Sequence, residues 1–275
     1  MRPSDVDAAT EMILSHEWGV RREWLQFATT EPACVPIGAE ADGVVVGTGV
    51  GTASGPAGWI GTIFIARDWR GHGLGRAITQ AIIDRLDARS CATLVLVATS
   101  EGRRLYERMG FEVQTHYRIL EAPGLVADEA PGVPHASAVR PYRDTDLPAM
   151  LALDRDGTGE DRSFAIRRLA SPETARVLDG PESGIEGFVI RAPWGGGATI
   201  AGSADAALAI ATSRRVASGP TGRVRVGVLA GNEGGLDRLA GAGFVEQWSA
   251  PRMVRGAPLR WRPDWIWGQF NHAMG

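Results

Sequence analysis

The sequence predicts an α/β protein of two tandem domains, each a mixed β-sheet flanked by helices. Three observations support this prediction. The chain has 275 residues, enough for two domains of about 100 to 200 residues each. Helical and strand-like segments alternate through residues 1–120. The pattern at the start of the chain then recurs after residue 137.

The first half is predicted to contain three helices and five strands. Asp5 can cap a helix whose apolar residues follow helical spacing to near Gly19. The polar and aromatic residues 18–27 are assigned no regular element. Asp42-Gly43 forms the turn of a β-hairpin, because it separates two apolar runs. The remaining elements are a strand at 59–65, a helix at 71–88, a strand at 93–97, a helix at 101–109 and an extended segment at 111–120.

The second half repeats the first. Arg2-Pro3 before the first helix recurs as Arg140-Pro141 before an acidic turn and a helix. Gly110-Phe111 recurs as Gly243-Phe244, again after a short strand and a short helix. The two offsets, 138 and 133 residues, nearly agree, which favours two copies of one fold over a coincidence of common turn signals. We expect a domain at 1–121, a linker at 122–136, a second domain at 137–256 and a Trp-rich tail at 257–275.

Composition excludes several functions. All 29 basic side chains are arginine, and there is no lysine, which excludes a Walker-A phosphate loop, a pyridoxal Schiff base and a kinase ATP site. A net charge of -3 without a basic cluster argues against nucleic acid as a partner. Cys34 and Cys91 are too few for a disulfide framework. Residues 1–14 lack the apolar core of a signal peptide, and no apolar run reaches the about 20 residues of a membrane span. We expect a cytoplasmic protein without a membrane partner.

A candidate phosphate loop, Arg-Gly-His-Gly-Leu-Gly-Arg at 70–76, lies where a predicted strand ends and an amphipathic helix begins. Backbone amides at a helix start have no intrahelical acceptor, and glycines let an anion approach the main chain closely. An ordinary tight turn could carry the same glycines. A dinucleotide-binding G-x-G-x-x-G motif does not fit, because Arg76 stands at its last position.

The loop also resembles a family signature. Arg70-x-x-Gly73-x-Gly75 is similar to the R/Q-x-x-G-x-G/A motif of the GNAT superfamily of acyl-CoA N-acyltransferases. Residues 105–111, Leu-Tyr-Glu-Arg-Met-Gly-Phe, resemble the second landmark of the same family. The two occur in the family's order, and the resemblance covers residues 2–120. The second half resembles the degenerate GNAT-like domain of tandem acetyltransferases, through residues 161–163 and 252–256.

The resemblance implies acetyl-CoA as cosubstrate and no metal. The pantetheine arm would pair with the strand before the loop, and the pyrophosphate would lie on the loop amides, with Arg70 and Arg76 as the local cations. In the second landmark, the family's asparagine is Thr99 here and its alanine is Gly102. The implied cofactor-binding residues are Ile63, Phe64, Ile65, Arg70, Gly71, His72, Gly73, Leu74, Gly75, Arg76 and Thr99.

The resemblance also assigns a proton donor. Tyr106 would protonate the leaving thiolate, and a phenol with an ordinary pKa near 10 stays protonated at neutral pH. The base is left open, because the strand at 59–65 lacks the glutamate that many relatives place there. Candidate acceptor contacts are Trp18, Glu23 and Trp24. Candidates for the base are Glu17, Glu23, Glu101, His72, His116, Asp264, His272 or a water molecule.

The second copy is not expected to bind CoA. Its segment 201–205, Ala-Gly-Ser-Ala-Asp, lacks the alternating glycines, and Asp205 would repel a pyrophosphate. The tail carries too much aromatic surface to leave in water, so it should pack on the body of the protein. There it would either wall the acceptor pocket or fill the core between the domains.

These expectations describe an N-acetyltransferase of class EC 2.3.1.-, which transfers an acetyl group from acetyl-CoA to the amine of a small-molecule or amino-acid-like acceptor by direct attack. The chain would act as a monomer or homodimer. One alternative is a tandem enzyme resembling mycothiol synthase, although that relative has its active copy in the second half. Another is a non-catalytic acyl-CoA-binding protein, which would explain the missing strand glutamate.

Overall fold

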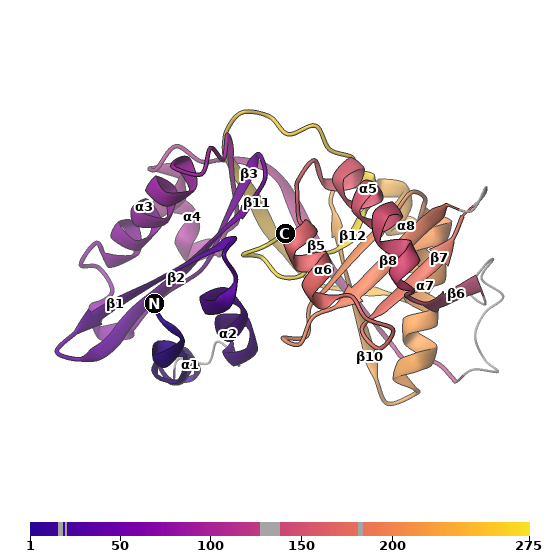
Figure 1. Ribbon diagram of the computed structural model, residues 1–275, viewed down its shortest axis with the longest axis horizontal. Coiled ribbons are helices and arrows are strands. Elements are labelled where there is room, and N and C mark those ends of the chain that lie inside the picture. The colour runs from indigo at the N-terminus through magenta and orange to yellow at the C-terminus, as the bar shows by residue number, and fades with distance from the viewer. Residues whose placement is uncertain (16–18, 20, 127–137, 181–183) are drawn as a thin grey trace.

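The computed structural model describes residues 1–15, 19, 21–126, 138–180 and 184–275. Within these residues the chain forms two β-sheets, of seven and five strands, with helices packed against them. In Figure 1 the first half of the chain lies on the left, the second half on the right, and the yellow tail returns between them. The predicted fold class, two tandem units of mixed α/β structure, is confirmed. Among the described helices, none combines the length and apolar character needed to cross a lipid bilayer.

The first half follows the predicted order of elements, with one additional helix. That helix, at Arg22–Thr30, buries Trp24, Leu25 and Phe27. Its aromatic and threonine residues have modest helix propensity, so packing rather than local preference determines it, and the sequence analysis missed it. The elements are α1 (Val6–Leu14), α2 (Arg22–Thr30), β1 (Cys34–Ala41), β2 (Val44–Ser54), β3 (Ala57–Ile65), α3 (Leu74–Asp87), β4 (Thr93–Val97), α4 (Ser100–Glu107) and β5 (Glu112–Pro123).

The second half repeats this order in altered form. Its elements are β6 (Val139–Pro141), α5 (Leu147–Thr158), α6 (Ser163–Leu169), β7 (Ala175–Asp179), β8 (Ile185–Arg191), β9 (Gly197–Ala201), α7 (Ala204–Ser218), β10 (Arg223–Leu229), α8 (Glu233–Gly241), β11 (Val245–Gly256) and β12 (Ile266–Gly268). Strand β12 belongs to the tail and has no counterpart in the first half.

The two halves exchange strands. The larger sheet has the order β1-β2-β3-β4-β11-β5-β10. Strand β11, from the second half, is antiparallel to both β4 and β5 of the first half. Strand β5 in turn pairs with β10 of the second half. In this shared sheet β11 lies between β4 and β5 of the first half, and β5 lies between β11 and β10 of the second half, whereas the smaller sheet consists of second-half strands.

The repeat is visible in the hydrogen bonds that start each half. The Asp5 carboxylate accepts from the Arg2 amide at 2.7 Å, and the Asp146 carboxylate accepts from the Arg143 amide at the same distance. The structural equivalent of Arg2 is therefore Arg143. The repeat predicted from the sequence places it three residues earlier, at Arg140, because an Arg-Pro pair occurs there.

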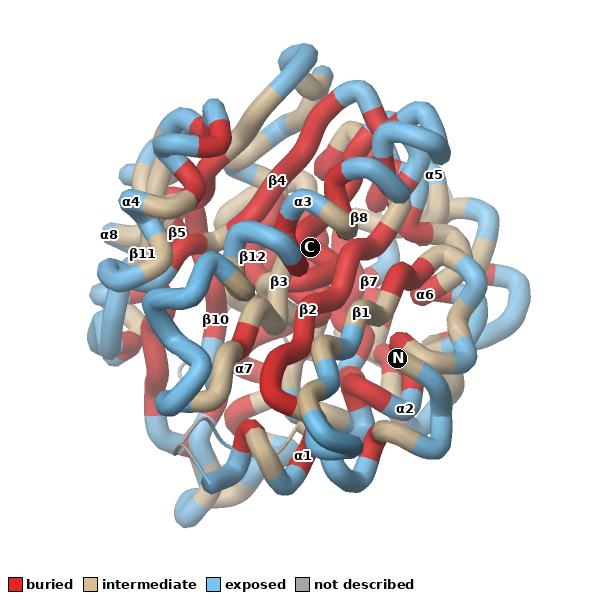
Figure 2. Tube along the Cα trace, turned by 90° about the vertical axis from the view of Figure 1, so that its left-hand side faces the viewer, coloured by how far each residue is buried: buried red, intermediate tan, exposed pale blue. Residues whose placement is uncertain are grey.

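Helix α3 packs directly on β2, because β2 carries glycines where the helix crosses it. A Cβ atom on Gly49 would lie 2.5 Å from Ile78 Cγ2, and one on Gly51 would lie 2.5 Å from Ile82 Cγ2. Both isoleucines are buried. Figure 2 shows buried segments along the central strands and exposed segments in the outer turns and on outward helix faces.

Candidate active site

The site begins where β3 and β4 separate. The two strands pair in parallel only from Ala57 to Ile60 on β3. A bulge follows, at which Thr62 has a φ of 55°. Thr48 Oγ1 donates to the Thr62 carbonyl at 3.0 Å, and Trp24 Nε1 donates to Thr62 Oγ1 at 2.9 Å. These two hydrogen bonds hold the bulge in place. Beyond the bulge, β3 still pairs with β2 on one edge, but its other edge no longer pairs with β4.

The candidate phosphate loop opens directly after β3. Gly71 and Gly73 both have a φ of 81°, a backbone conformation that favours glycine. No side chain caps the start of α3, and its first turn contains no acidic residue. The α3 amides therefore face outward without a competing carboxylate, which suits an anion. Arg70 Nε donates to the Ile65 carbonyl at 3.1 Å, so this arginine also fixes the loop to the strand.

Tyr106 lies on α4 across the opening. Its side chain is 8% exposed, and its ring meets Phe111 edge to face at 6.2 Å. Burial raises the pKa of Tyr106 to about 12, which keeps the hydroxyl protonated at neutral pH. Thr99 Oγ1 accepts from the Gly102 amide at 3.1 Å and so caps α4. The chain thus places a helix cap where the resemblance suggested a contact to the cofactor.

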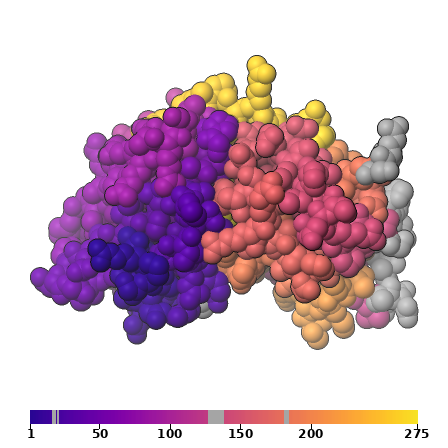
Figure 3. Space-filling view, viewed as in Figure 1, coloured from indigo at the N-terminus to yellow at the C-terminus, as the bar shows by residue number. Residues whose placement is uncertain are grey.

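One cavity of about 2000 Å³ contains the opening, the loop and Tyr106, and it extends to the second half. Figure 3 shows the two halves meeting face to face, with yellow tail atoms along the upper edge of their boundary. Of the predicted cofactor residues, every one except His72 lines this cavity. The lining set is Ile63, Phe64, Ile65, Arg70, Gly71, Gly73, Leu74, Gly75, Arg76 and Thr99.

The predicted acceptor contacts are only partly brought together. Trp24 lines the cavity. Glu23 is exposed on α2 and His72 is exposed in the loop, and neither lines it. Trp18 and the base candidate Glu17 lie outside the described residues.

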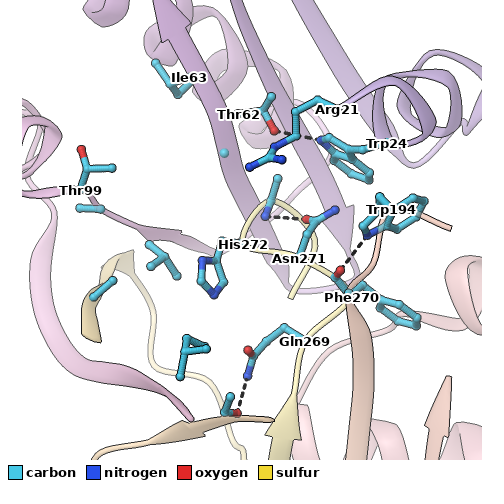
Figure 4. A pocket seen from close by; sticks show the side chains of 18 of the residues that line it. Arg21, Trp24, Thr62, Ile63, Thr99, Trp194, Gln269, Phe270, Asn271 and His272 are labelled. Carbon is cyan, nitrogen blue, oxygen red and sulfur yellow. Dashed lines mark hydrogen bonds between the residues drawn. The ribbon is translucent and has the colours of Figure 1, made fainter. Parts of the chain in front are cut away.

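Two of the base candidates, Glu101 and His272, line the cavity, whereas His116 and Asp264 do not. In the view of Figure 4, the His272 ring lies between Thr99 on one side and Arg21 and Trp24 on the other. The ring stacks on Tyr117 at 5.6 Å and meets Trp248 edge to face at 5.5 Å.

The surroundings of His272 keep it neutral. Burial, and to a lesser extent the positive charge of Arg21, lower the pKa of His272 to about 4. The backbone of this segment also touches β3, because a Cβ atom on Gly61 would lie 2.8 Å from the His272 carbonyl oxygen. The tail therefore places the neutral imidazole of His272 next to the point where β3 and β4 separate.

The tail also fills the corresponding place in the second half. Strand β12 runs antiparallel to β9, with Ile266 opposite Ile200 and Gly268 opposite Thr199. By chain order, β9 is the counterpart of β3. Ser203 caps the following helix, α7, by accepting from the Ala206 amide at 3.1 Å. In the first half, the edge of β3 and the start of α3 are open. In the second half, β12 pairs with the corresponding edge of β9, and Ser203 caps the start of α7.

The first turn of α7 also contains an acidic residue, whereas the first turn of α3 contains none. Asp205, in the first turn of α7, pairs with Arg238 at 2.7 Å. Trp267 of the tail is 2% exposed and Phe270 is fully buried, so the tail packs on the body. Because Gln269 and His272 line the cavity, the tail both walls the cavity and fills core.

Known proteins resemble this chain in sequence and in fold. Residues 5–111 match the model of the Acetyltransferase (GNAT) family. A putative acetyltransferase from Pyrococcus horikoshii is 18% identical, with a TM-score of 0.82 over 100% of this chain and 94% of that one. A GCN5-related N-acetyltransferase from Sphaerobacter thermophilus is 15% identical, with a TM-score of 0.65 over 95% and 96%. A tandem GNAT protein from the clavulanic acid biosynthesis pathway is 14% identical, with a TM-score of 0.62 over 94% and 98%. No curated protein matches the sequence.

The first half of the chain thus carries the sequence pattern of an acetyltransferase family. Residues 5–111 belong to the GNAT acetyltransferase family, and the chain as a whole has the fold of tandem GNAT proteins.

Proposed function

We propose that this chain is an acyl-CoA-dependent N-acyltransferase that moves an acetyl group from acetyl-CoA to the amine of a small molecule. The observation that carries the proposal is the separation of β3 from β4, which opens into one cavity between the glycine loop and Tyr106. Ligand sites usually measure about 300 to 1,000 Å³. A cavity of about 2000 Å³ therefore has room for a donor and an acceptor together.

The chain offers the groups that a CoA thioester needs. Beyond Ile60, the main chain of β3 has no partner on β4, and it can pair with the amides of pantetheine. The outward amides at the start of α3 suit the pyrophosphate, and Arg76 lines the same part of the cavity. The bound thioester would supply an activated acyl group.

The residues around the opening can move the protons of the reaction. As the amine nitrogen bonds to the acyl carbon and the carbon–sulfur bond breaks, Tyr106 would donate its hydroxyl proton to the sulfur. His272 is neutral, and its lowered pKa makes it a weak base. It would accept the proton that the nitrogen loses as the new bond makes that nitrogen strongly acidic. The products are an amide and the free thiol of CoA, and the proton on His272 returns to Tyr106 through water.

The test compares thiol release from acetyl-CoA across a panel of amines for the wild type and Tyr106→Phe. We expect the kcat of Tyr106→Phe to fall about 100-fold or more, with the Kd for CoA changed less than about twofold. Tight CoA binding without turnover of any amine by the wild type would favour the non-catalytic acyl-CoA-binding alternative.

The loop assignment has its own matched pair of variants. Gly73→Ala and Gly73→Glu share the strain of a positive φ, but only Gly73→Glu adds a carboxylate at the pyrophosphate position. Calorimetry should show CoA binding lost in Gly73→Glu and largely kept in Gly73→Ala. Equal affinities in the two variants would contradict the loop assignment.

The mycothiol-synthase-like alternative receives no support from the second half. Its counterpart of the donor site is filled by β12, and Asp205 stands at the start of α7. We propose one CoA per chain, bound in the first half, and native mass spectrometry can count it.

A further inference from the structure

The cavity continues from the opening between β3 and β4 to a wall built by the second half. This wall is made by β7, β8, α7 and β10, and it is rich in arginine: Arg176, Arg191, Arg214, Arg223 and Arg225 line it. The carboxylates that line the same wall are Glu121 and Glu173. The balance of charge on this wall is therefore positive.

Glu121 forms ion pairs with two of these arginines. Its carboxylate accepts from Arg223 NH1 at 2.9 Å and from Arg225 Nε at 2.6 Å. These bonds lower the pKa of Glu121, so it is ionised at neutral pH and balances part of the charge of the pair. Glu173 is exposed and accepts from the Ser171 hydroxyl at 2.6 Å.

Of the other three arginines, Arg176 donates to the backbone carbonyls of Pro172 and Ala175, at 2.6 and 2.8 Å, which leaves Arg191 and Arg214. Within the described part of the chain, neither forms an ion pair with an acidic side chain, and the hydrogen bond of Arg214 is to the backbone carbonyl of Arg225, at 3.1 Å. Burial, and to a lesser extent the positive charge of Arg191, lower the pKa of Arg214 to about 10. Arg214 is thus still charged at neutral pH, partly desolvated and close to a like charge.

Placing the guanidinium groups of Arg191 and Arg214 near each other costs free energy unless an anion binds between them. Arg191 is exposed and Arg214 is partly buried, so the like charges of the two guanidinium groups repel each other across the cavity and the desolvation of Arg214 adds to the cost. A carboxylate or a phosphate removes the repulsion and accepts several directed hydrogen bonds from the planar guanidinium groups. In the protein alone, no described side chain fills this role.

The position of the pair separates it from the proposed donor site. Arg191 ends β8 and Arg214 lies on α7, both in the second half, whereas the glycine loop belongs to the first. Trp194 follows three residues after Arg191. Its ring meets Trp24 edge to face at 5.2 Å, and its Nε1 donates to the Phe270 carbonyl at 2.7 Å. An aromatic surface thus connects the arginine wall to the bulge at Thr62, as Figure 4 shows for Trp24 and Trp194.

We infer that the acceptor is a small amine that also carries an anionic group, a carboxylate or a phosphate, and that Arg191 and Arg214 bind this group. The inference rests on the proposed function, because it places the amine of the same molecule near Tyr106 and His272. It narrows the acceptor from any small amine to amino acids and to amines bearing a phosphate.

The first experiment measures anion binding directly. The protein is saturated with CoA, which occupies the loop, and is titrated by calorimetry with succinate and with inorganic phosphate. We expect one site for at least one anion, with affinity reduced about tenfold or more in Arg191→Gln and in Arg214→Gln. Arg85→Gln, which removes the same charge from the exposed face of α3 outside the cavity, should bind as the wild type does. The tighter of the two anions identifies the group.

The second experiment measures transfer to three acceptors of similar length: 3-aminopropanoate, 2-aminoethyl phosphate and 3-aminopropanamide. After correction for the neutral fraction of each amine, at least one anionic acceptor should have a kcat/KM about tenfold or more above that of the amide. Arg191→Gln and Arg214→Gln should remove this preference through KM, with the Kd for CoA unchanged. Arg214→Lys should restore part of it, because it keeps the charge without the planar fork.

The outcomes separate this inference from the proposed function. Transfer that proceeds equally well with charged and uncharged acceptors overturns the inference and leaves the function standing. Anion binding that neither variant alters means an adventitious ion only, and it also overturns the inference. Absence of CoA binding to the wild type overturns the proposed function, and the anion titration without CoA then still tests the arginine pair.

Discussion

The indole Nε1 of Trp59 donates to both carboxylate oxygens of Glu160, at 3.0 and 2.9 Å, across the boundary between the two halves. The side chains of Arg162 and Arg252, 2% and 1% exposed, lie in the same region. Burial raises the pKa of Glu160 to about 7, although both arginines oppose this rise. The halves are thus joined by a buried polar network in which one carboxyl group titrates near neutrality.

Glu160 should make folding stability decrease as pH rises. Its folded pKa of about 7 lies above the ordinary 4.5, so the stability it contributes is present below pH 4.5 and is lost as pH rises through about 7. Glu160→Gln removes the titration and keeps an acceptor for Trp59. We expect this variant to gain roughly 1–3 kcal/mol over the wild type between pH 4.5 and pH 8. Urea unfolding at the two pH values measures this gain, and an identical difference at both would contradict the assignment.

His272 should act in the opposite direction. Its folded pKa of about 4 lies below the ordinary 6.5, so the stability it contributes is present above pH 6.5 and is lost as pH falls through about 4. In the wild type this trend opposes that of Glu160. His272→Gln should therefore lose less stability than the wild type on acidification from pH 7 to pH 4.5. Its kcat should also fall, and an unchanged kcat would remove His272 from the proposed mechanism.

Gly102 gives the Tyr106 ring its room. A Cβ atom at this position would lie 3.1 Å from Tyr106 Cε2 and 3.3 Å from Thr99 Oγ1. We expect Gly102→Ala to shift the ring by a few tenths of an ångström, lowering kcat about tenfold while changing the free energy of unfolding by less than about 1 kcal/mol. Gly234→Ala, near the start of α8 with no atom within 4 Å of its Cβ position, is the matched control and should leave kcat unchanged. Equal kcat values in the two variants would contradict the steric argument.

The strand exchange predicts that neither half folds alone. Fragment 1–126 would lack β11, which separates β4 from β5, and would expose unpaired edges on both. We expect it to be unfolded or aggregated by circular dichroism and gel filtration, whereas coexpression with fragment 138–275 should restore a stable complex. A folded, monomeric fragment 1–126 would show that the domain at 1–121, which stays a prediction, is independent of the second half.

The sequence analysis predicted local features well because they depend on neighbouring residues. The strand at 93–97 coincides with β4, and the turn at Asp42-Gly43 joins β1 to β2 as expected. The insertion of β11 between β4 and β5 was not predicted, because the choice of a strand's partner depends on contacts distant in sequence. The same limit applies to α2, whose buried face finds its partners only in the folded protein.

The candidate site shows a similar division. The loop glycines and Tyr106 were found from their motifs, and the structure places them around one cavity. His272 was one of many possible bases, and only the path of the tail distinguishes it. Arg191 and Arg214 carried no sequence signal, since arginines outside any motif in an arginine-rich chain look like solvated surface. A buried pair such as Trp59 and Glu160, 101 residues apart, leaves no local pattern to read.

Strand β12 can be regarded as a ligand that the second half carries covalently. A tethered segment reaches an effective concentration in the millimolar range or above and binds without the entropy cost of capturing a free molecule. Any diffusing thioester would have to displace it against this advantage. The duplication thus leaves one copy with an open strand edge and the other with its edge covered by its own chain, and the covering segment continues onward to position His272 beside the open edge.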